Sequence, residues 1–150
     1  MNRVVVTGIG IVSSLGNNQQ EVKESLYHTK SGISFDEDQK KMGFRSCVSG
    51  QIKIDLENSI ERKFLRFMGD GASYNYLSML EAIKDSNLSE DEISNNKTGL
   101  IMGSGGPSTK SLLRAFDITR EKGPKKIGPT SVPKVMCSTN SATLSTYFKI

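Results

Sequence analysis

The sequence predicts an α/β domain, and three segments carry that prediction. Residues 4–6 form a run of uncharged β-branched side chains, which suits a strand buried on both faces. Residues 60–87 repeat apolar side chains every three or four positions, as a long helix does. Residues 98–102 form a second apolar run that ends at a glycine-rich loop. Buried strands that alternate with helices are typical of a parallel or mixed sheet.

The N-terminal segment joins the first predicted strand to a glycine turn, Thr7-Gly8-Ile9-Gly10. Glycine tolerates positive φ and therefore allows a tight turn. A packed strand with a tight loop is the simplest interpretation. The alternative is a dinucleotide-binding fingerprint, G-x-G-x-x-G/A, which this segment matches except that Ser13 occupies the third glycine position. The next helix also begins too late to direct its N-terminus at a pyrophosphate.

The helix after the turn is predicted over residues 17–29, because Asn17-Asn18 is a helix-start signal and Ser31-Gly32 ends the pattern. Residues 44–54 alternate apolar and polar side chains, which predicts a strand with one solvated face. His28, the single histidine, falls in the last turn of the helix predicted over residues 17–29 and is interpreted as a solvated residue.

The predicted helix over residues 60–87 has an apolar stripe and a basic beginning. The stripe consists of Phe64, Met68, Ala72, Tyr76, Met79 and Ile83. Arg62, Lys63 and Arg66 lie in the first turns, where cations oppose the helix dipole. An ordinary solvated face explains these cations, and a docking patch for an acidic partner explains them equally well.

The second half of the chain adds further helices around the strand at residues 98–102. Ser89-Glu-Asp-Glu92 matches a capping box and predicts a short helix. The loop at residues 103–110 resembles a phosphate loop but lacks its G-K-[ST] order. A helix over residues 108–120 is predicted to turn Leu112, Leu113 and Phe116 inward. A helix over residues 134–148 is rich in small side chains, so we expect neighbours or a second subunit to bury it.

Composition excludes several classes of protein. The 150 residues make one domain by length. The net charge of +4 suits an acidic partner but does not indicate a nucleic-acid-binding surface. No run reaches the ~20 apolar residues of a membrane span. No signal peptide is recognised. Cys47 and Cys137 are far apart and are interpreted as reduced, buried thiols in a cytoplasmic protein.

The residues do not assemble a catalytic constellation in the sequence. No serine or cysteine occupies a strand–turn–helix elbow with a histidine available as its base. No cluster of histidine, cysteine and carboxylate residues has the spacing of a metal site, and no cofactor is implied. The residues alone therefore predict a soluble α/β domain without a complete active site.

A family resemblance extends through essentially the whole chain in order. Its most similar segments are residues 3–18, 31–33, 60–63, 66–68, 99–106 and 148–150. These segments resemble the N-terminal part of the β-ketoacyl-acyl carrier protein synthases, close to the type I enzymes of bacterial fatty-acid synthesis. The resemblance implies a thiolase-like α-β-α-β-α fold, of which residues 1–150 would be an incomplete first half with a mixed sheet.

The resemblance also implies an activity. Members of this family are cytoplasmic homodimers that extend an acyl chain by decarboxylative condensation with malonyl-acyl carrier protein. Their nucleophilic cysteine, two histidines and supporting lysine come after the Phe-Lys-Ile that ends this sequence, so the 150-residue chain alone is predicted to be inactive. A non-catalytic module that binds acyl carrier protein or a synthase subunit is one alternative, and a nucleotide-binding domain is another.

Several family roles fall on residues of this chain. The resemblance assigns docking of the acidic acyl carrier protein to Arg62, Lys63 and Arg66, with Lys125 near a second part of the patch. It assigns the acyl pocket to Gly106, at the pocket floor, and to Met136, which reaches the partner subunit's pocket. Pro107 and the serine, threonine and asparagine residues within 134–145 depart from the family pattern.

Overall fold

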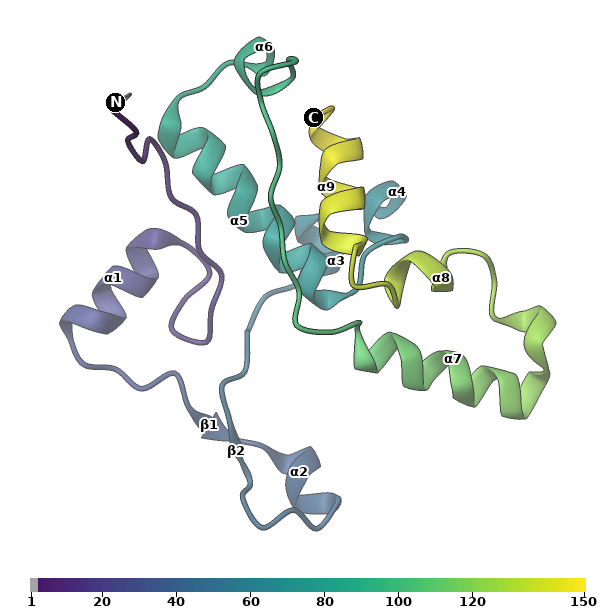
Figure 1. Cartoon of the computed structure of the whole chain (residues 1–150). Coiled ribbons are helices and arrows are strands. Elements are labelled where there is room, and N and C mark those ends of the chain that lie inside the picture. Colours follow the sequence, from purple (N-terminus) through teal and green to yellow (C-terminus); the bar gives the residue numbers. More distant parts are fainter. Residues whose placement is uncertain (1–2) are drawn as a thin grey trace. The chain divides into compact units, whose positions relative to one another are not determined.

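The computed structural model describes residues 3–150, so Met1 and Asn2 of the predicted N-terminal segment lie outside the described residues. The chain divides into two compact units. Unit 1 contains residues 3–55 and Leu77–Asn87, and unit 2 contains Leu56–Tyr76 and Leu88–Ile150. Helix α5 (Asp70–Ser86) contributes to both units (Figure 1).

Unit 1 contains the first predicted helix and a small antiparallel sheet. Helix α1 (Gln19–Tyr27) begins after Asn18, whose side chain accepts a hydrogen bond from the Glu21 amide, so the predicted helix start is confirmed. Strands β1 (Ser34–Phe35) and β2 (Val48–Ser49) pair antiparallel, and α2 (Glu37–Lys41) lies between them. The strand predicted over residues 44–54 is therefore reduced to two residues.

The buried strand predicted at residues 4–6 is wrong for this structure. Val4, Val5 and Val6 are 90%, 64% and 82% exposed, and no strand is assigned there. The following N–H groups of Ile9 and Ile11 donate instead to the Asp85 and Glu81 carboxylates of α5, each at 2.9 Å. A β-branched run favours extended backbone, but a buried strand also needs a neighbouring strand, which residues 3–150 do not supply here.

Unit 2 is helical. Besides the first half of α5, it contains α3 (Leu56–Ser59), α4 (Arg62–Leu65), α6 (Glu90–Ile93), α7 (Thr109–Lys122), the 3₁₀ helix η1 (Pro124–Lys126), α8 (Ser131–Lys134) and α9 (Thr139–Phe148). The predicted capping box is confirmed, since the Ser89 amide donates to Glu92 at 2.9 Å. Helix α7 begins after Ser108, whose hydroxyl accepts from the Ser111 amide.

The single helix predicted over residues 60–87 is wrong, because it is divided into α4 and α5. Gly69 lies between the two helices, and glycine is a poor helix former. Asp70 then begins α5 with an acidic side chain in the first turn, where the helix dipole favours it. The apolar stripe is partly confirmed, since Met68, Ala72 and Tyr76 are buried.

The core of unit 2 forms where α4, α5 and α9 meet. Leu144 of α9 is completely buried. Four aromatic rings from these three helices pack together, with centroids 4.4 Å apart for Phe64 and Tyr147 and 4.6 Å apart for Tyr76 and Tyr147. Phe148 contacts both tyrosines. Edge-on packing of this kind contributes about 1 kcal/mol per pair beyond the area buried. This aromatic cluster fixes α4 against the rest of unit 2.

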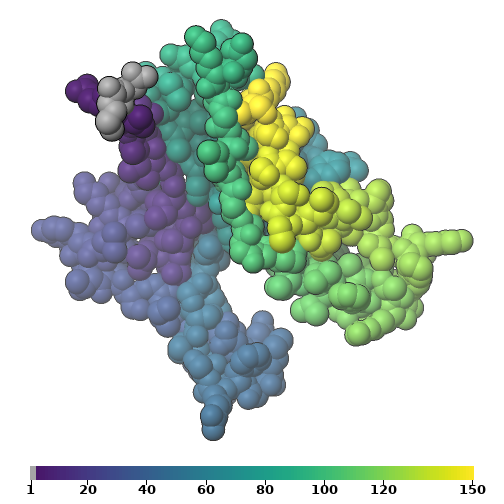
Figure 2. All heavy atoms as spheres, in the orientation of Figure 1, coloured from purple at the N-terminus to yellow at the C-terminus, as the bar shows by residue number. Residues whose placement is uncertain are grey.

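Residues 98–102 are extended but unpaired, which corrects the second predicted strand. Ile101 is 97% exposed, and the segment runs beside α9 in unit 2 (Figure 2). Side-chain hydrogen bonds connect the residues before and after this segment to α9 and its C-terminus, from Ser94 Oγ to the Lys149 carbonyl at 2.7 Å and from Asn140 Nδ2 to the Gly103 carbonyl at 3.4 Å. As at residues 4–6, an apolar run does not form a β-strand unless a neighbouring strand pairs with its backbone hydrogen-bonding groups.

Two smaller predictions about burial are also wrong. Leu113 and Phe116 of α7 are exposed rather than turned inward, and Leu112 alone of the three is half-buried. Cys137 is exposed and Cys47 is half-buried, so neither thiol is enclosed in a core. Helical spacing identifies one face of a helix, but it does not say whether another element covers that face.

Candidate functional site

The predicted docking residues lie on and just after α4. Arg62, Lys63 and Arg66 are all exposed. Lys63 Nζ lies 2.7 Å from a Glu61 carboxylate oxygen and 4.7 Å from the centroid of the Phe64 ring. An exposed ion pair of this kind contributes little to stability, so Lys63 remains available to an outside anion. Phe64 belongs to the aromatic cluster, and this places the cations on a firmly packed turn.

A cavity of about 540 Å³ lies beside this turn, lined by Glu57, Asn58, Arg62, Leu65, Arg66 and Lys134. Three of these side chains are cations and one is a carboxylate. The sequence did not predict Lys134 as part of the patch, because it lies far along the chain in α8 and no local pattern connects it to α4. Lys63 does not line the cavity. Lys125 lies in η1, beside α7, and does not line it either.

The two predicted acyl-pocket residues line one pocket of about 180 Å³ in unit 2. Gly106 and Met136 share its wall with residues from the start of α5 and from α9. A side chain added at Gly106 would meet no atom within 4 Å, so the absence of a side chain leaves open space there. Met136 is 50% exposed. The tertiary structure thus brings together two residues that lie 30 positions apart in the sequence.

Lys134 also lines this smaller pocket, so the same side chain borders both the 540 Å³ cavity and the 180 Å³ pocket. An anionic group in the larger cavity and a chain in the smaller pocket would both lie close to Lys134. Such an arrangement suits a ligand with a charged end and a less polar end.

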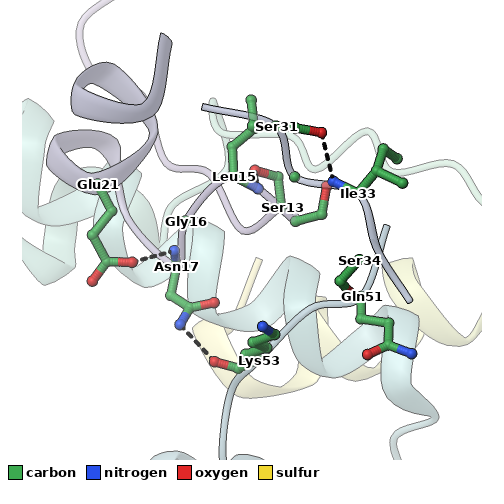
Figure 3. A pocket seen from close by; sticks show the side chains of 12 residues that line it. Ser13, Leu15, Gly16, Asn17, Glu21, Ser31, Ile33, Ser34, Gln51 and Lys53 are labelled. Carbon is green, nitrogen blue, oxygen red and sulfur yellow. Dashed lines mark hydrogen bonds between the residues drawn. The ribbon is translucent and has the colours of Figure 1, made fainter. Parts of the chain in front are cut away.

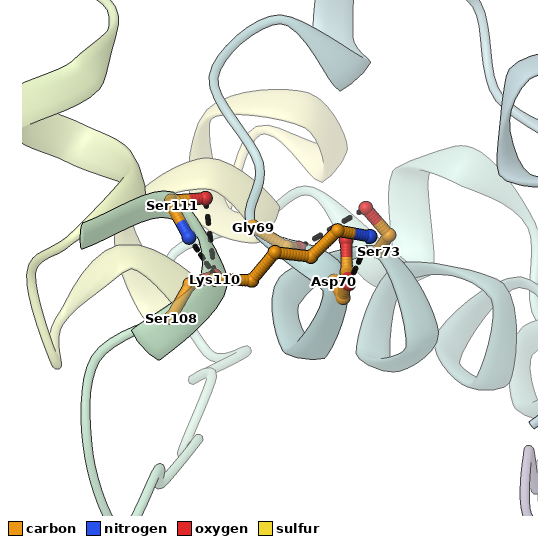
Figure 4. A network of polar contacts seen from close by, with 6 residues as sticks. All are labelled: Gly69, Asp70, Ser73, Ser108, Lys110 and Ser111. Carbon is orange, nitrogen blue, oxygen red and sulfur yellow. Dashed lines mark hydrogen bonds and ion pairs between the residues drawn. The ribbon is translucent and has the colours of Figure 1, made fainter. Parts of the chain in front are cut away.

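A polar network lies next to the pocket, since Gly69 and Ser108 belong to both (Figure 4). Lys110 of α7 pairs with Asp70 of α5 at 3.2 Å. The buried hydroxyl of Ser73 donates to the Gly69 carbonyl at 3.1 Å, and the Ser108 hydroxyl donates to Ser111 Oγ at 3.0 Å. These bonds fix the first turns of α5 and α7, the two elements that flank residues 69–72 and 104–108 of the pocket wall.

Tyr76 supports the site from within the core. Burial and the hydrogen bond with Tyr147 raise the pKa of the Tyr76 hydroxyl far above its usual value of 10.0. The phenol therefore stays neutral across the physiological range, and its role is to hold α5 against α9 rather than to exchange a proton.

The candidate nucleophiles and ligands of the chain do not form a reactive centre among the described residues. The Cys47 thiol, in unit 1, donates to the Phe44 carbonyl at 3.4 Å, while Cys137 belongs to unit 2. The His28 ring packs edge-on against Tyr27. Within residues 3–150 no three histidine, cysteine, aspartate or glutamate residues are grouped closely enough to hold a metal ion.

Unit 1 contains a separate polar cavity of about 320 Å³ beside the start of α1 (Figure 3). Its internal bonds hold the loops together, since the Asn17 amide donates to Glu21 at 2.7 Å and the Asn17 side chain donates to the Lys53 carbonyl at 2.8 Å. Ser34 Oγ is buried there and has no hydrogen-bond partner among residues 3–150. None of the predicted site residues lies in this cavity.

The glycine turn that matched a dinucleotide fingerprint has a structural explanation in unit 1. Side chains added at Gly8 or Gly10 would overlap the α5 backbone carbonyls of Ala82 and Ser78. These glycines therefore permit close packing of the turn on α5. Among residues 3–150, no helix combines the length and apolar character needed to cross a membrane.

Comparison with known proteins shows which proteins this chain is similar to. The whole chain, residues 1–150, matches the family described as "Beta-ketoacyl synthase, N-terminal domain". It is 50% identical over 151 residues to 3-oxoacyl-[acyl-carrier-protein] synthase 1 of Haemophilus influenzae, covering 100% of this chain and 37% of that relative. The chain thus spans little more than a third of the length of this relative.

Solved structures agree with the sequence match. A β-ketoacyl synthase from Burkholderia phymatum STM815 superposes with a TM-score of 0.84 at 25% identity, covering 100% of this chain and 38% of that one. A ketosynthase solved with its type II polyketide acyl carrier protein superposes with a TM-score of 0.74 at 19% identity, covering 99% of this chain and 39% of that one.

The predicted fold class is confirmed by this likeness, even though the strands expected at residues 4–6 and 98–102 are unpaired within this chain. The match to the family over residues 1–150 and the identity to 3-oxoacyl-[acyl-carrier-protein] synthase 1 both confirm the resemblance seen in the sequence. The chain belongs to the β-ketoacyl synthase family and is homologous to the N-terminal part of 3-oxoacyl-[acyl-carrier-protein] synthase 1.

Proposed function

We propose that this chain serves a 3-oxoacyl-[acyl carrier protein] synthase, an enzyme that elongates fatty acyl chains by decarboxylative condensation with malonyl-acyl carrier protein. In that reaction a cysteine thiolate takes the acyl group from its thioester, and the carbanion left when malonyl loses CO₂ attacks the acyl carbonyl. Residues 1–150 contribute a docking surface and part of the acyl pocket. The name of the Haemophilus influenzae relative supports the activity.

The cationic cavity beside α4 is the observation that carries this proposal. Arg62, Arg66 and Lys134 surround about 540 Å³ of open space, with Glu57 as the only acidic side chain of its lining. Cations gathered around a cavity attract an acidic partner and accelerate its association. Acyl carrier protein is such a partner, and one structural neighbour was solved in complex with its acyl carrier protein. Lys63 and Lys125 extend the proposed docking surface.

The smaller pocket supports the second part of the proposal. Gly106 leaves its floor open, and the flexible thioether of Met136 lines the same space. A half-exposed methionine also suits an interface with a second subunit. We therefore propose that the intact protein is a homodimer in which Met136 contributes to the partner's acyl pocket. A cytoplasmic location belongs to the same proposal.

Charge reversal tests the docking surface. The double variant Arg62→Glu/Arg66→Glu should bind acyl carrier protein at least tenfold more weakly than the unchanged chain, since both cations face the cavity. Fluorescence titration at 50 mM and 200 mM salt measures this, and the loss should be larger at low salt.

The matched control is Lys23→Glu/Lys30→Glu, two exposed cations of unit 1 that change the net charge equally. This control should keep its affinity for acyl carrier protein. Equal affinities in the two double variants would show that α4 is not the docking surface.

The same cavity favours one alternative, a non-catalytic module that binds acyl carrier protein without condensing its cargo. Docking alone would satisfy the geometry of Arg62, Arg66 and Lys134. Since the 150-residue chain alone is predicted to be inactive under both functions, an assay of acyl and malonyl thioester condensation separates them only when it is run with the intact protein that contains these residues. Docking without any 3-oxoacyl product favours the module.

A further inference from the structure

The polar cavity of unit 1 is built from loops that lie apart in the sequence. Residues 13–17, 31–34 and 51–53 supply most of its wall, and Glu21 of α1 adds to it (Figure 3). Its volume of about 320 Å³ lies at the lower end of the range of about 300–1,000 Å³ that small-molecule sites in proteins occupy. The proposed function uses no residue of this cavity, so its polar groups are available to another ligand.

Two serine hydroxyls of the wall have a hydrogen atom left to donate. Ser13 Oγ accepts from the Leu15 amide at 3.2 Å, and Ser31 Oγ accepts from the Ile33 amide at 3.1 Å. A hydroxyl carries one O–H donor besides the lone pairs that accept. Neither O–H group donates to an acceptor within residues 3–150. Both serines are therefore held by the backbone and offer a donor to an occupant of the cavity.

Two further hydroxyls make no hydrogen bond within the described part of the chain. Ser34 Oγ is buried and unpaired. Ser14 Oγ is also unpaired, and it lies beside two glycines, since a Cβ atom added at Gly32 or Gly50 would come within 2.5 or 3.1 Å of it. Glycine at these positions leaves space for the Ser14 hydroxyl. A buried hydroxyl without a partner is unfavourable, and a ligand that accepts hydrogen bonds would supply the missing partner.

The charges around the cavity favour an anion. Glu21 is the one carboxylate of the lining, and both of its oxygens are already bound, Oε2 by the Asn17 amide at 2.7 Å and Oε1 by Asn18 Nδ2 at 2.9 Å. Lys53 is exposed, and its ammonium group makes no ion pair with residues 3–150. The lining therefore presents an unpaired cation and unpaired O–H donors, while its carboxylate is satisfied within the loop.

These groups match a phosphate ester. A phosphate group offers several acceptor oxygens and a negative charge, which suit hydroxyl donors and the ammonium group of a lysine. At about 30 Å³ for each water-sized group, a cavity of 320 Å³ holds about ten heavy atoms, and a phosphate group fills about half of that space. The rest of the space suits a small polar carbon skeleton, because most of the lining side chains are polar.

We propose that this cavity is a binding site for a small phosphate monoester. Lys53 pairs with the phosphate group, and the hydroxyls of Ser14 and Ser34 donate to its oxygens. Ser13 and Ser31 supply further donors. The inference is independent of the proposed function, because none of these residues lines the cationic cavity beside α4 or the pocket that contains Gly106.

Three small probes test the inference on the full 150-residue chain. Glycerol 3-phosphate has the size and charge proposed for the ligand, glycerol lacks the phosphate, and inorganic phosphate lacks the carbon skeleton. Binding is followed by NMR through the backbone amide signals of residues 13–17 and 51–53. We expect glycerol 3-phosphate to bind about tenfold more tightly than glycerol, because the unpaired cation and hydroxyls need a charged acceptor. Inorganic phosphate should bind about threefold more weakly than the ester, because it leaves part of the cavity empty.

Substitutions in the wall locate the site. Lys53→Met removes the cation of the lining and should weaken binding of glycerol 3-phosphate about tenfold. Ser14→Ala and Ser34→Ala each remove one donor and should weaken it about threefold. Lys23→Met is the matched control, because Lys23 is an exposed cation of unit 1 outside the cavity, and it should bind as the unchanged chain does. Circular dichroism checks that each variant is folded.

Several results would overturn the inference. Equal binding of glycerol and glycerol 3-phosphate would show that the cavity does not recognise phosphate, and equal binding of inorganic phosphate would remove the assignment to an ester. Unchanged affinity in Lys53→Met, or no movement of the signals from residues 13–17 and 51–53, would place the phosphate elsewhere. None of these results affects the proposed docking at α4, which the charge-reversal variants measure separately.

Discussion

Two glycine-rich segments look alike in the sequence and differ in the structure. Thr7-Gly8-Ile9-Gly10 and Gly103-Ser104-Gly105-Gly106 each follow an apolar run that predicts a strand. In unit 1, side chains added at Gly8 and Gly10 would overlap the α5 backbone, so packing requires glycine at both positions. In unit 2, side chains added at Gly103, Gly105 and Gly106 would meet no atom within 4 Å.

The difference shows that a glycine motif has no single meaning. The first segment uses glycine to bring two backbones together, and its amides are bound by carboxylates of α5. The second uses glycine to leave room beside a pocket, and one asparagine holds it to α9. The first segment is therefore a stability element, while we propose that the second is part of a binding site.

Substitution at Gly10 should have the largest effect on stability. Gly10→Ala places a methyl group against the Ser78 carbonyl, which cannot move without disrupting α5. We expect a loss of about 3 kcal/mol in the free energy of unfolding. Urea denaturation followed by circular dichroism measures it. Gly103→Ala is the matched control and should change stability by less than about 1 kcal/mol, in the stabilising direction. Similar losses in both variants would contradict the comparison.

Removal of the Glu81 charge, which holds the N-terminal segment against α5, should have an intermediate effect on the free energy of unfolding. The Glu81 carboxylate accepts from the Ile11 amide at 2.9 Å and from the Gln19 amide at 2.8 Å. Glu81→Gln turns one of these acceptors into a donor, so we expect a loss of about 2 kcal/mol. The same urea experiment applies. Glu121→Gln removes an exposed charge of α7 and should have almost no effect, and an equal loss there would argue against a specific role for Glu81.

Low pH should have the smallest effect on the free energy of unfolding. It should act on α6, the helix that precedes the glycine-rich segment at residues 103–106. The Ser89 amide, followed by the Ser89 hydroxyl, lowers the pKa of Glu92 below its usual 4.5. A lowered folded-state pKa means that this contribution to stability is present above pH 4.5 and is lost as the pH falls through the folded value.

Glu92→Gln should therefore remove part of the acid sensitivity of the free energy of unfolding below pH 4.5. Denaturation of both proteins between pH 3 and pH 7 measures the difference. Asp36, whose pKa is also lowered, chiefly by the Gln39 amide, is present in both proteins and does not affect the comparison. Parallel pH profiles would show that the capping box contributes nothing.

Local signals predicted the starts of α1 and α6 well, but not those of α5 and α9, which begin at Asp70 and Thr139. The Asn18 side chain accepts from the Glu21 amide, and the Ser89 amide donates to the Glu92 carboxylate. Both contacts lie within three residues, so they depend on the sequence nearby. Strands were predicted poorly for the opposite reason. Val4–Val6 and Ile101 have strand-like side chains, but a strand is stabilised by a neighbour that local sequence does not specify.

The candidate site was predicted in part. The resemblance in the sequence indicates Arg62, Arg66, Gly106 and Met136, which line the two cavities of the proposed site. Lys134 and Asn140 were not singled out as site residues, because each reaches its cavity from a segment distant in the sequence. Their contribution becomes visible only when α8 and α9 are placed beside α4 and α5 in unit 2.

The sequence by itself determined the family, the helix caps and the excess of positive charge, because each depends on residue identity or on contacts within one turn. Only the tertiary structure decided which glycines are packed and which border open space. It also decided that Lys134 borders two cavities and that the Asn140 side chain donates to the Gly103 carbonyl. The physical reason is that burial and hydrogen bonding at these positions depend on distant segments, which the chain brings together only when it folds.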